Sequence, residues 1–576
     1  MSAAPEINSA RRRLLAVAVL LAVIPYLNSL HGEFTFDDPV LIRDNPLVSG
    51  DGASALRLFT TPYRFGPLEP MYRPVTLLSY FLNAHWANSL VAYHAVNVAL
   101  HAMVTAGALL ISWVLLDSAL GALVTAALFA VHPIHTEAVA SIVGRAELLA
   151  AACVLAALLA VIRAERTAGT ARLAWRAASL TAVALGLLSK ESAIVAIPLG
   201  ALISLWVQPV PRLHPTIRML VPYLAVASAY MALRRLIVGS LTVPSMFNVL
   251  DNPLAHVDLL PRLRTAIVVL WDYLSQMVVP LRLSADYSFD AVPIAASVLD
   301  PRFVVAVGAL STLGVALIVY VRRAPVLGIA AAFTVVPLAL TANIFFLIGT
   351  IKAERLLYLP SLGCCLAAGW WVARQPRQRR WLVIVGVVVV AYAVRTWIRN
   401  ADWQNDFTLF SAAVETTPRS AKAHYNLAIA CENRGETALA LRHFREALAI
   451  YPLDADAAFG VGRMYEKRNQ IDAALEAYTH ATQLNWHVAN AHLNIGAIHY
   501  KRHDYAAAES AFRAGLESEP ANPRLLIGLS LALWAQGDEA QAAAVFAQIR
   551  APAADTADTA RLMAEARAIM QRKAGQ

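Results

Sequence analysis

The sequence predicts an all-α protein: a polytopic transmembrane helix bundle followed by an α-helical solenoid. Three observations support this prediction. The chain of 576 residues is 58% hydrophobic and only 15% charged, and its mean hydropathy of +0.53 is unusual for a soluble protein. Long apolar segments alternate with short basic loops up to residue 400. Beyond that point, alanine-rich amphipathic helices recur at a fixed period, which indicates stacked repeats.

About eleven apolar segments have the length that a bilayer requires. They lie at 14–30, 93–116, 119–133, 146–162, 177–189, 193–207, 219–238, 303–321, 325–348, 356–373 and 381–398. The first follows three arginines and ends without a small-residue cleavage site, so we interpret it as a retained signal anchor. The segment 265–283 does not fit the alternation, and we expect it to be re-entrant or to lie along the membrane interface.

The positions of the basic residues predict the orientation of the bundle. Basic clusters occupy alternate loops on the side of the N-terminal arginines, at 163–176, 211–218, 322–323 and 374–380. Because basic loops remain in the cytoplasm, the N-terminus is expected there and the C-terminal repeats on the other side. Topology therefore accounts for the net charge of +9 better than nucleic-acid binding does. The four cysteines predict no disulfide framework.

The C-terminal part of the chain repeats every 34 residues. The recurring positions are aromatic (Phe444, Tyr478, Phe512, Phe546), aliphatic (Leu427, Val461, Ile495, Leu529) and small (Ala440, Ala474, Ala508, Ala542), with Pro452, Trp486 and Pro520 at the junctions. This combination is typical of tetratricopeptide repeats. Phe410, Ala413 and Pro418 lie one period earlier, so a half repeat follows the last span directly.

Four regions are therefore expected along the chain. They are a transmembrane domain at 1–400, a half-repeat linker at 401–417, four tetratricopeptide repeats at 418–553, and a capping helix with a tail at 554–576. A solenoid needs such a cap because its last repeat would otherwise expose an apolar face. Nearly all unusual polar clusters fall in loops on the external side, as a single active site there would require.

The acidic pair Asp37 and Asp38 is the first of these clusters, and it lies a few residues after the first apolar segment. Carboxylates near lipid usually mark function. We expect a general base, a metal ligand or both. The alternative is an interfacial turn or helix cap, because Asp-Asp-Pro is favourable turn chemistry.

Two histidine-containing clusters follow. His132, His135 and Glu137 share one short loop, where they either cap helix ends or orient a substrate; their spacing does not match the common zinc motifs. His94 forms a polar stripe with Asn97 and His101 on a membrane helix. Hydrogen bonding between helices explains this stripe as well as catalysis does.

Three further motifs combine a cation with a carboxylate at the outer ends of spans. They contain Arg145 and Glu147, Lys190 and Glu191, and Lys352, Glu354, Arg355 and Tyr358. Structural ion pairs explain any one of them. Three cationic motifs on one face instead suggest phosphate recognition, for which arginine forks are well suited.

In the repeats, Asn426 and Asn494 occupy equivalent positions, with Gly460 and Gly528 in the intervening repeats. On the first helix of a repeat, this position is expected to face the concave groove. Asparagine there could bind the backbone of an extended acceptor peptide. A solvated surface position is the alternative.

Several long motifs resemble those of one family. "FTFDDPVLIRDNP", "YRPVTLLSYFLN", "YHAVNVALHA", "FAVHPIHTEAVASIVGRAELLA", "LLSKESAI" and "ERLLYLPSLG" occur in this order, as in the transmembrane and tetratricopeptide-repeat protein O-mannosyltransferases of the GT-C superfamily. The resemblance covers nearly the whole chain and is weakest in 208–302. It implies that Asp37 and Asp38 match the catalytic motif of the first external loop and that Arg355 contacts the donor phosphate. Alanine- and arginine-rich usage suggests a bacterial member.

The resemblance implies a membrane glycosyltransferase. It would move a hexose, with mannose as the expected sugar, from a polyprenyl phosphate to Ser/Thr hydroxyls of exported proteins. The expected location is the inner membrane, with the repeats in the periplasm. No cofactor is expected, and no ligand spacing supports a divalent cation. The alternatives are a ligase for lipid-linked glycans or glycolipids and a non-catalytic membrane scaffold.

From the same resemblance and the external location, candidate roles extend to other residues. Donor phosphate contacts are expected from Arg355, Lys190, Arg145 and Lys352, and substrate orientation from His132, His135, Glu137, Glu191 and His94. The resemblance places the base at the first acid, Asp37. Because two adjacent residues of an extended loop point to different sides, the two acids are not expected to share one role. Asp38 would then orient the acceptor or a neighbouring cation.

Overall fold

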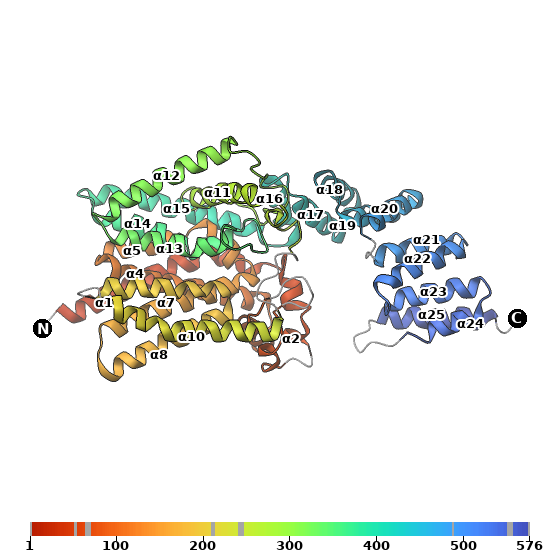
Figure 1. Cartoon of the computed structure of the whole chain (residues 1–576), viewed down its shortest axis with the longest axis horizontal. Coiled ribbons are helices and arrows are strands. Elements are labelled where there is room, and N and C mark those ends of the chain that lie inside the picture. Colours follow the sequence, from red (N-terminus) through yellow and green to blue (C-terminus); the bar gives the residue numbers. More distant parts are fainter. Residues whose placement is uncertain are drawn as a thin grey trace. The chain divides into compact units, whose positions relative to one another are not determined.

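The computed structural model describes residues 3–50, 54–63, 71–208, 213–239, 247–485, 489–549 and 557–573. These residues form helices and turns without a β-strand, which confirms the predicted all-α class. The chain divides into two compact units, Met1–Pro418 and Arg419–Gln576. Figure 1 shows the long helices of the first unit in red to green and the helix pairs of the second in blue. The finer division into four regions stays a prediction.

Within the described residues, seven helical segments are long and apolar enough to cross a membrane. They are Arg11–His31, Leu90–Leu116, Ile142–Glu165, Gly169–Ser189, Leu213–Val238, Pro301–Val321 and Gln378–Asp402. The bent pair Ala119–Ala130 and Pro133–Val139 makes an eighth if it is one span. The structure thus confirms several apolar helices but not the predicted count of eleven, because the other three segments form shorter helices.

The helices of the first unit are labelled in chain order. Those at or near membrane-spanning length are α1 (Ala3–Val23), α4 (Leu90–Leu116), α5 (Ala119–Ala130), α7 (Arg145–Glu165), α8 (Gly169–Ser189), α9 (Ala196–Val207), α10 (Leu213–Val238), α12 (Pro301–Val321), α13 (Val326–Thr341), α14 (Ser361–Ala373) and α15 (Gln378–Asp402). The helices α4, α7 and α8 pack side by side, and Leu155 and Leu158 of α7 are fully buried between them.

The short helix α14 approaches both α5 and α13 unusually closely. A Cβ atom on Gly369 of α14 would lie 2.2 Å from Thr125 Oγ1, and one on Gly363 would lie 2.2 Å from the carbonyl of Ala330. Small residues let membrane helices pack backbone to backbone where apolar burial gives little preference for protein over lipid. This packing places the start of α14 next to the candidate site described below.

Shorter elements connect these helices. They are η1 (Ile24–His31), η2 (Pro39–Arg43), α2 (Pro46–Ser49), η3 (Arg57–Phe59), α3 (Pro74–Trp86), η4 (Pro133–His135), α6 (Thr136–Val139), η5 (Ile142–Gly144), η6 (Glu191–Val195), η8 (Pro253–His256), α11 (Leu259–Gln276) and η9 (Glu354–Leu357). The helix α11 covers part of the 265–283 segment and is not among the spans. Its interfacial or re-entrant placement stays a prediction.

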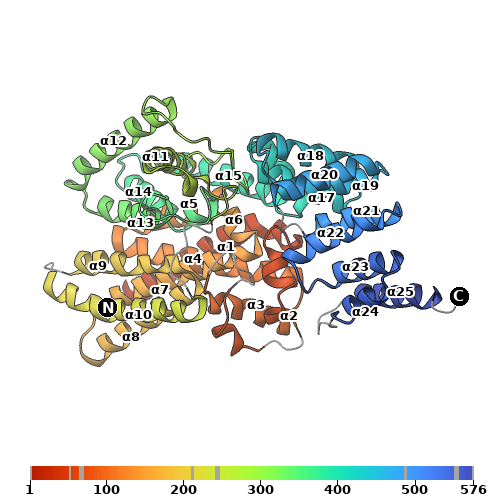
Figure 2. The same cartoon turned by 45° about the vertical axis from the view of Figure 1, so that its right-hand side comes forward.

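The first unit ends with α16 (Asp406–Thr416), the predicted half repeat. The second unit contains α17 (Ala421–Asn433), α18 (Thr437–Ile450), α19 (Ala455–Lys467), α20 (Ile471–Leu484), α21 (Ala489–Lys501), α22 (Tyr505–Ser518), α23 (Pro523–Ala535), α24 (Glu539–Phe546) and α25 (Ala557–Lys573). Figure 2 shows α17 to α24 as successive helix pairs. The helix α25 packs against α23, where a cap was expected.

The 34-residue period explains how the pairs pack. Ala440, Ala474 and Ala508 are fully buried where paired helices cross. The rings of Phe444 and Phe512 lie so close to Gly460 and Gly528 that a Cβ atom there would come within 2.6 Å of them. Each aromatic ring therefore fills the space beside the first helix of the next repeat, which confirms the repeat architecture. The predicted junction residue Trp486 lies outside the described residues.

Candidate active site

The acidic pair lies in a tight turn after the first span. Asp38 is fully buried; its Oδ2 accepts a hydrogen bond from the Thr35 N–H at 3.0 Å and its Oδ1 accepts one from the Val143 N–H at 2.8 Å. Burial raises the pKa of Asp38 to about 7, although these N–H groups oppose the shift. The bond with Thr35 closes the turn and the bond with Val143 fastens it to η5, so the geometry gives Asp38 an anchoring role.

Asp37 is half-buried, whereas Asp38 is fully buried. Burial lowers the pKa of Arg355, but the charges of Glu137 and then Asp37 more than offset this, so the pKa is raised overall. The charge of Asp37 thus acts on Arg355. The different surroundings of Asp37 and Asp38 agree with the expectation that the two acids do not share one role.

Arg355 belongs to η9 and pairs with the loop that precedes α7. Its guanidinium forms an ion pair with Glu137 Oε1, and its backbone N–H donates to Glu137 Oε2 at 2.8 Å. The side chain of Glu137 is 2% exposed, whereas that of Arg355 is 33% exposed. Glu137 thus holds Arg355 from the protein side and leaves part of the guanidinium accessible to a ligand.

Lys190 follows the outer end of α8 and forms an ion pair with Glu147 in the first turn of α7. Burial lowers the pKa of Lys190, Glu147 opposes this shift, and the charges of Arg73 and Arg355 add to it. These couplings place three cations near one another at the outer end of the bundle.

Arg73 is the residue of this group that sequence reasoning missed. Its guanidinium donates to Glu191 Oε2 at 3.0 and 3.1 Å and lies over the Tyr63 ring at 5.2 Å from the centroid. The sequence feature that could have identified Arg73 is its position before Pro74 in "YRPVTLLSYFLN", one of the motifs that carry the resemblance. We call Arg73, Lys190, Arg355, Asp37, Glu137, Glu147 and Glu191 the outer charge cluster.

The ion pairs of this cluster join different motifs rather than neighbours in the sequence. Glu147 pairs with Lys190 instead of Arg145, and Glu191 pairs with Arg73 instead of Lys190. Adjacent residues at a helix end point in different directions, so each finds its partner on another helix. The ion pairs of Glu147 and Glu191 therefore connect different motifs.

Arg145, a predicted phosphate ligand, lies inside the protein and is 0% exposed. It donates to the side-chain oxygens of Asn97 at 2.9 Å and Asn83 at 2.8 Å. It also donates to the carbonyls of Ser79 and Tyr93. Because all these partners are neutral protein groups and no surface is exposed, the geometry opposes phosphate binding by Arg145 and gives it a structural role.

Lys352 also lies apart from the outer charge cluster. Its Nζ is 3.7 Å from Asp272 Oδ2 and 4.3 Å from the centroid of the Tyr287 ring. Burial lowers the pKa of Lys352, and the carboxylates that oppose this shift are Asp272 and Glu354. These contacts favour a role for Lys352 in the packing of the 272–290 region over the predicted contact with the donor phosphate.

The predicted histidines form hydrogen bonds within the bundle. His132 Nε2 contacts the Met277 carbonyl at 2.9 Å, and its Nδ1 accepts from the Ile134 N–H at the start of η4. His135 contacts Ser361 Oγ at 2.8 Å, and His94 contacts the Gly32 carbonyl at 3.2 Å. All three are buried. The geometry favours capping and helix contacts over direct substrate orientation.

Glu354 forms a second buried site behind Arg355. Its Oε1 accepts hydrogen bonds from the Ser284 N–H at 2.5 Å and from the Tyr287 hydroxyl at 2.7 Å, and its Oε2 lies 3.9 Å from Arg399. Burial raises the pKa of Glu354 to about 7. These contacts fix η9, and with it Arg355, to the 284–287 loop and to the end of α15.

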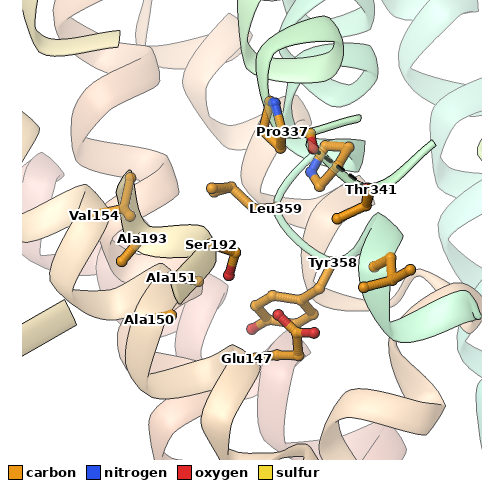
Figure 3. Close-up of a pocket in the computed structure, with 12 residues that line it drawn as sticks. Glu147, Ala150, Ala151, Val154, Ser192, Ala193, Pro337, Thr341, Tyr358 and Leu359 are labelled. Carbon is orange, nitrogen blue, oxygen red and sulfur yellow. Dashed lines mark hydrogen bonds between the residues drawn. The ribbon is translucent and has the colours of Figure 1, made fainter. Parts of the chain in front are cut away.

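An apolar slot begins beside the outer charge cluster. It encloses about 30 Å³ and runs along α7 from Glu147 to Val154, a distance of about 10 Å at the helical rise. Figure 3 shows Glu147, Ser192 and Tyr358 at its polar end and Ala150, Val154, Ala193 and Leu359 along its walls. A space of about 30 Å³ has room for roughly one water molecule, so the slot in this form does not accommodate a lipid chain.

In the repeats, the two predicted asparagines differ. The Asn426 amide nitrogen is buried and has no hydrogen-bond partner among the residues that the structure describes, whereas Asn494 is half-buried. The equivalent Gly460 and Gly528 face the aromatic rings of preceding helices. This position therefore lies partly against the neighbouring repeat, and acceptor binding there stays a prediction. Among the described residues, no group of three metal-ligating side chains comes together.

Comparison with protein-family models supports the resemblance. Residues 240–314 match the model described as "Protein O-mannosyl-transferase TMTC, DUF1736". Residues 421–454 and 499–566 match tetratricopeptide-repeat models. The chain thus carries a TMTC-type DUF1736 region and tetratricopeptide repeats, which confirms the resemblance predicted from the sequence. The bacterial origin stays a prediction.

Curated proteins with the same layout are similar over most of the chain. Protein O-mannosyl-transferase TMTC3 of Mus musculus is 30% identical over 479 residues, which cover 76% of this chain and 51% of that protein. Protein O-mannosyl-transferase F38B6.6 of Caenorhabditis elegans is 28% identical, covering 76% of this chain and 63% of that protein. The chain thus spans about half to two thirds of the length of these relatives. Among solved structures, the crystal structure of MamA protein is 18% identical over 25% of this chain and 78% of that chain, with a TM-score of 0.23.

Proposed function

We propose that this chain is a membrane glycosyltransferase that moves a hexose, specifically mannose, from a polyprenyl phosphate to Ser/Thr hydroxyls of exported proteins. The observation that carries the proposal is the partly exposed Arg355, which Glu137 holds from the protein side and on which the charge of Asp37 acts. The names of the relatives in the comparisons support O-mannosyl transfer to protein. The cations of the outer charge cluster support a phosphate-linked donor.

The reaction requires only groups that the outer charge cluster offers. The acceptor hydroxyl oxygen attacks the anomeric carbon of the sugar, and the bond between that carbon and the phosphate oxygen breaks. The hydroxyl proton passes to the Asp37 carboxylate, acting as general base. The departing phosphate keeps the bonding electrons, and Arg355 and Lys190 stabilise its charge. Phosphate is a good leaving group, so no strong acid is needed.

The carrier lipid would lie along α7, where the small side chains of Ala150, Ala151 and Ala193 line the slot. The slot encloses about 30 Å³, roughly the volume of one water molecule, so the lipid chain would have to displace the slot's walls.

The protein acceptor would enter from the external side, where the repeats offer a binding surface. The arginine distribution supports an inner-membrane protein with a cytoplasmic N-terminus and periplasmic repeats. Replacing both Asn426 and Asn494 with alanine should lower modification of protein acceptors several-fold and spare a small hydroxyl acceptor. Equal losses with both acceptors would remove the acceptor role from these asparagines.

The proposal is tested with the purified full chain in lipid vesicles, polyprenyl-phosphate mannose and a serine- and threonine-rich exported protein. Mass spectrometry should detect a gain of one hexose on Ser or Thr. Transfer from a lipid-linked oligosaccharide, with none from the monosaccharide donor, would favour the ligase alternative. Unimpaired partner capture without transfer from any donor would favour the scaffold.

A further inference from the structure

The segment that leads from the last span into the repeats lies against the loop that carries Asp37. Asp406, the first residue of α16, accepts a hydrogen bond at Oδ1 from the backbone N–H of Phe36 at 2.8 Å. Phe36 directly precedes Asp37. Phe36 and Asp406, which are 370 positions apart in the sequence, are thus hydrogen-bonded directly beside the candidate base.

Phe36 has a backbone conformation that phenylalanine rarely adopts. Its φ angle is +57°, in the left-handed region, where a Cβ atom crowds the backbone. Such residues persist only where surrounding contacts hold them, and they concentrate at functional sites. This turn reverses the chain immediately before Asp37 and so decides the direction in which Asp37 points.

Two further contacts hold the same turn from the same side. The Phe36 ring packs edge-on against Phe410 of α16, with centroids 5.8 Å apart. The Glu33 N–H donates to the Gln404 carbonyl at 2.8 Å. Asp38 anchors the other side of the turn through Val143. Asp37 therefore lies between an anchor on η5 and an anchor on residues 404–410.

We propose that Asp406 is a positioning residue for the Asp37 site. Its carboxylate stabilises the left-handed Phe36 and thereby aims Asp37 at the acceptor hydroxyl. Burial of Asp406 raises its pKa while the bond to Phe36 opposes the shift, as expected for a carboxylate held in place for this bond. The inference rests on the proposed function, because it concerns the orientation of the proposed base.

The variants Asp406→Ala and Asp406→Asn separate positioning from mere packing. The alanine variant removes the acceptor for Phe36, and the expected result is a 10- to 100-fold lower kcat, the range typical of a misplaced catalytic group. Donor KM should change little, because Arg355 and Lys190 are untouched. The asparagine variant keeps an oxygen that can accept the same bond and should retain most of the activity.

A glycine at position 36 supplies a rescue test. Glycine enters the left-handed region without the Cβ penalty, so Asp406→Ala combined with Phe36→Gly should recover part of the kcat lost in Asp406→Ala alone. Glu415→Ala is the matched control, because Glu415 lies exposed on the same helix. It should behave like the unmodified chain.

The assay uses the full chain in vesicles with polyprenyl-phosphate mannose and a protein acceptor. An unchanged kcat in Asp406→Ala would overturn the inference. An equal loss of kcat in Asp406→Ala and Asp406→Asn would also overturn it. The same holds for a loss of kcat that accompanies a lower unfolding temperature and weaker donor binding. Absence of transfer by the unmodified chain would instead overturn the proposed function, so the two failures are distinguishable.

Discussion

The outer charge cluster and the buried arginine site around Arg145 use similar residues in different surroundings. Arg355 pairs with a carboxylate and remains 33% exposed, whereas Arg145 is 0% exposed and bonds only neutral oxygens. A cationic side chain that binds a ligand must be partly exposed and must also be held in place by protein groups. A cationic side chain buried among amide and carbonyl oxygens already has its hydrogen-bond partners, so its removal lowers the stability of the fold. Exposure and partner type therefore separate candidate catalytic cations from structural ones.

The largest expected effect is on the outer charge cluster, at Asp37. The Asp37→Asn variant keeps the size of the side chain and removes the basic oxygen. Loss of a general base typically costs about 100- to 10,000-fold in rate, so turnover should nearly vanish while donor binding and expression persist. Turnover is measured as hexose transfer to a protein acceptor. Near-normal turnover in this variant, with loss in Asp38→Asn, would reverse the two roles.

The next largest effect should occur at the buried site. Lysine at position 145 cannot reach the oxygens of Asn83, Asn97, Ser79 and Tyr93 with the fork geometry of arginine. The unsatisfied acceptors should lower the free energy of unfolding by on the order of 3 kcal/mol, measured by denaturation in detergent. Donor KM in the remaining folded protein should be unchanged. A specific rise in donor KM without destabilisation would return Arg145 to the donor site.

Arg355→Lys should show the opposite behaviour. A lysine retains the charge but loses the fork that suits a phosphate, so donor KM should rise about tenfold. The unfolding temperature should change little, because the partly exposed side chain contributes less to the fold. Unchanged kinetics with a short-chain donor would make the pair with Glu137 purely structural and would remove the contrast with Arg145.

The smallest effect concerns Asp38, which belongs to the loop of the active region but is buried like Arg145. Its pKa rises from 3.8 to about 7 on folding. The folded protein therefore holds this proton more tightly, and the contribution of Asp38 to stability is full below the ordinary pKa and is lost as the pH rises toward about 7. Activity should rise over the same interval, since only the ionised carboxylate accepts from both Thr35 and Val143.

Unfolding temperature and turnover measured from pH 5 to pH 8 should thus change in opposite directions. In Asp38→Asn both dependences should flatten, because the amide does not titrate. If stability in the unmodified chain instead rises with pH over this interval, Asp38 does not carry the raised pKa, and its anchoring role must be assigned to another group.

The sequence by itself determined the two-part architecture. Apolar segments of bilayer length must be helical, because lipid offers no partner for backbone groups. A 34-residue period requires stacked helix pairs, because one pair cannot bury its apolar face alone. The architecture depends only on local composition and spacing. The roles expected of Asp37 and Arg355 rest in addition on the family resemblance of their motifs.

Tertiary structure decided which charges meet. The pairs of Lys190 with Glu147 and of Arg73 with Glu191 join helix ends from different parts of the chain. The burial of Arg145 among Asn83 and Asn97, and the bond between Phe36 and Asp406, likewise depend on how the bundle packs. Sequence spacing specifies the direction of a side chain on its own element, but its partner depends on which element crosses nearby. That crossing is set by side-chain packing across the whole bundle, which no single motif contains.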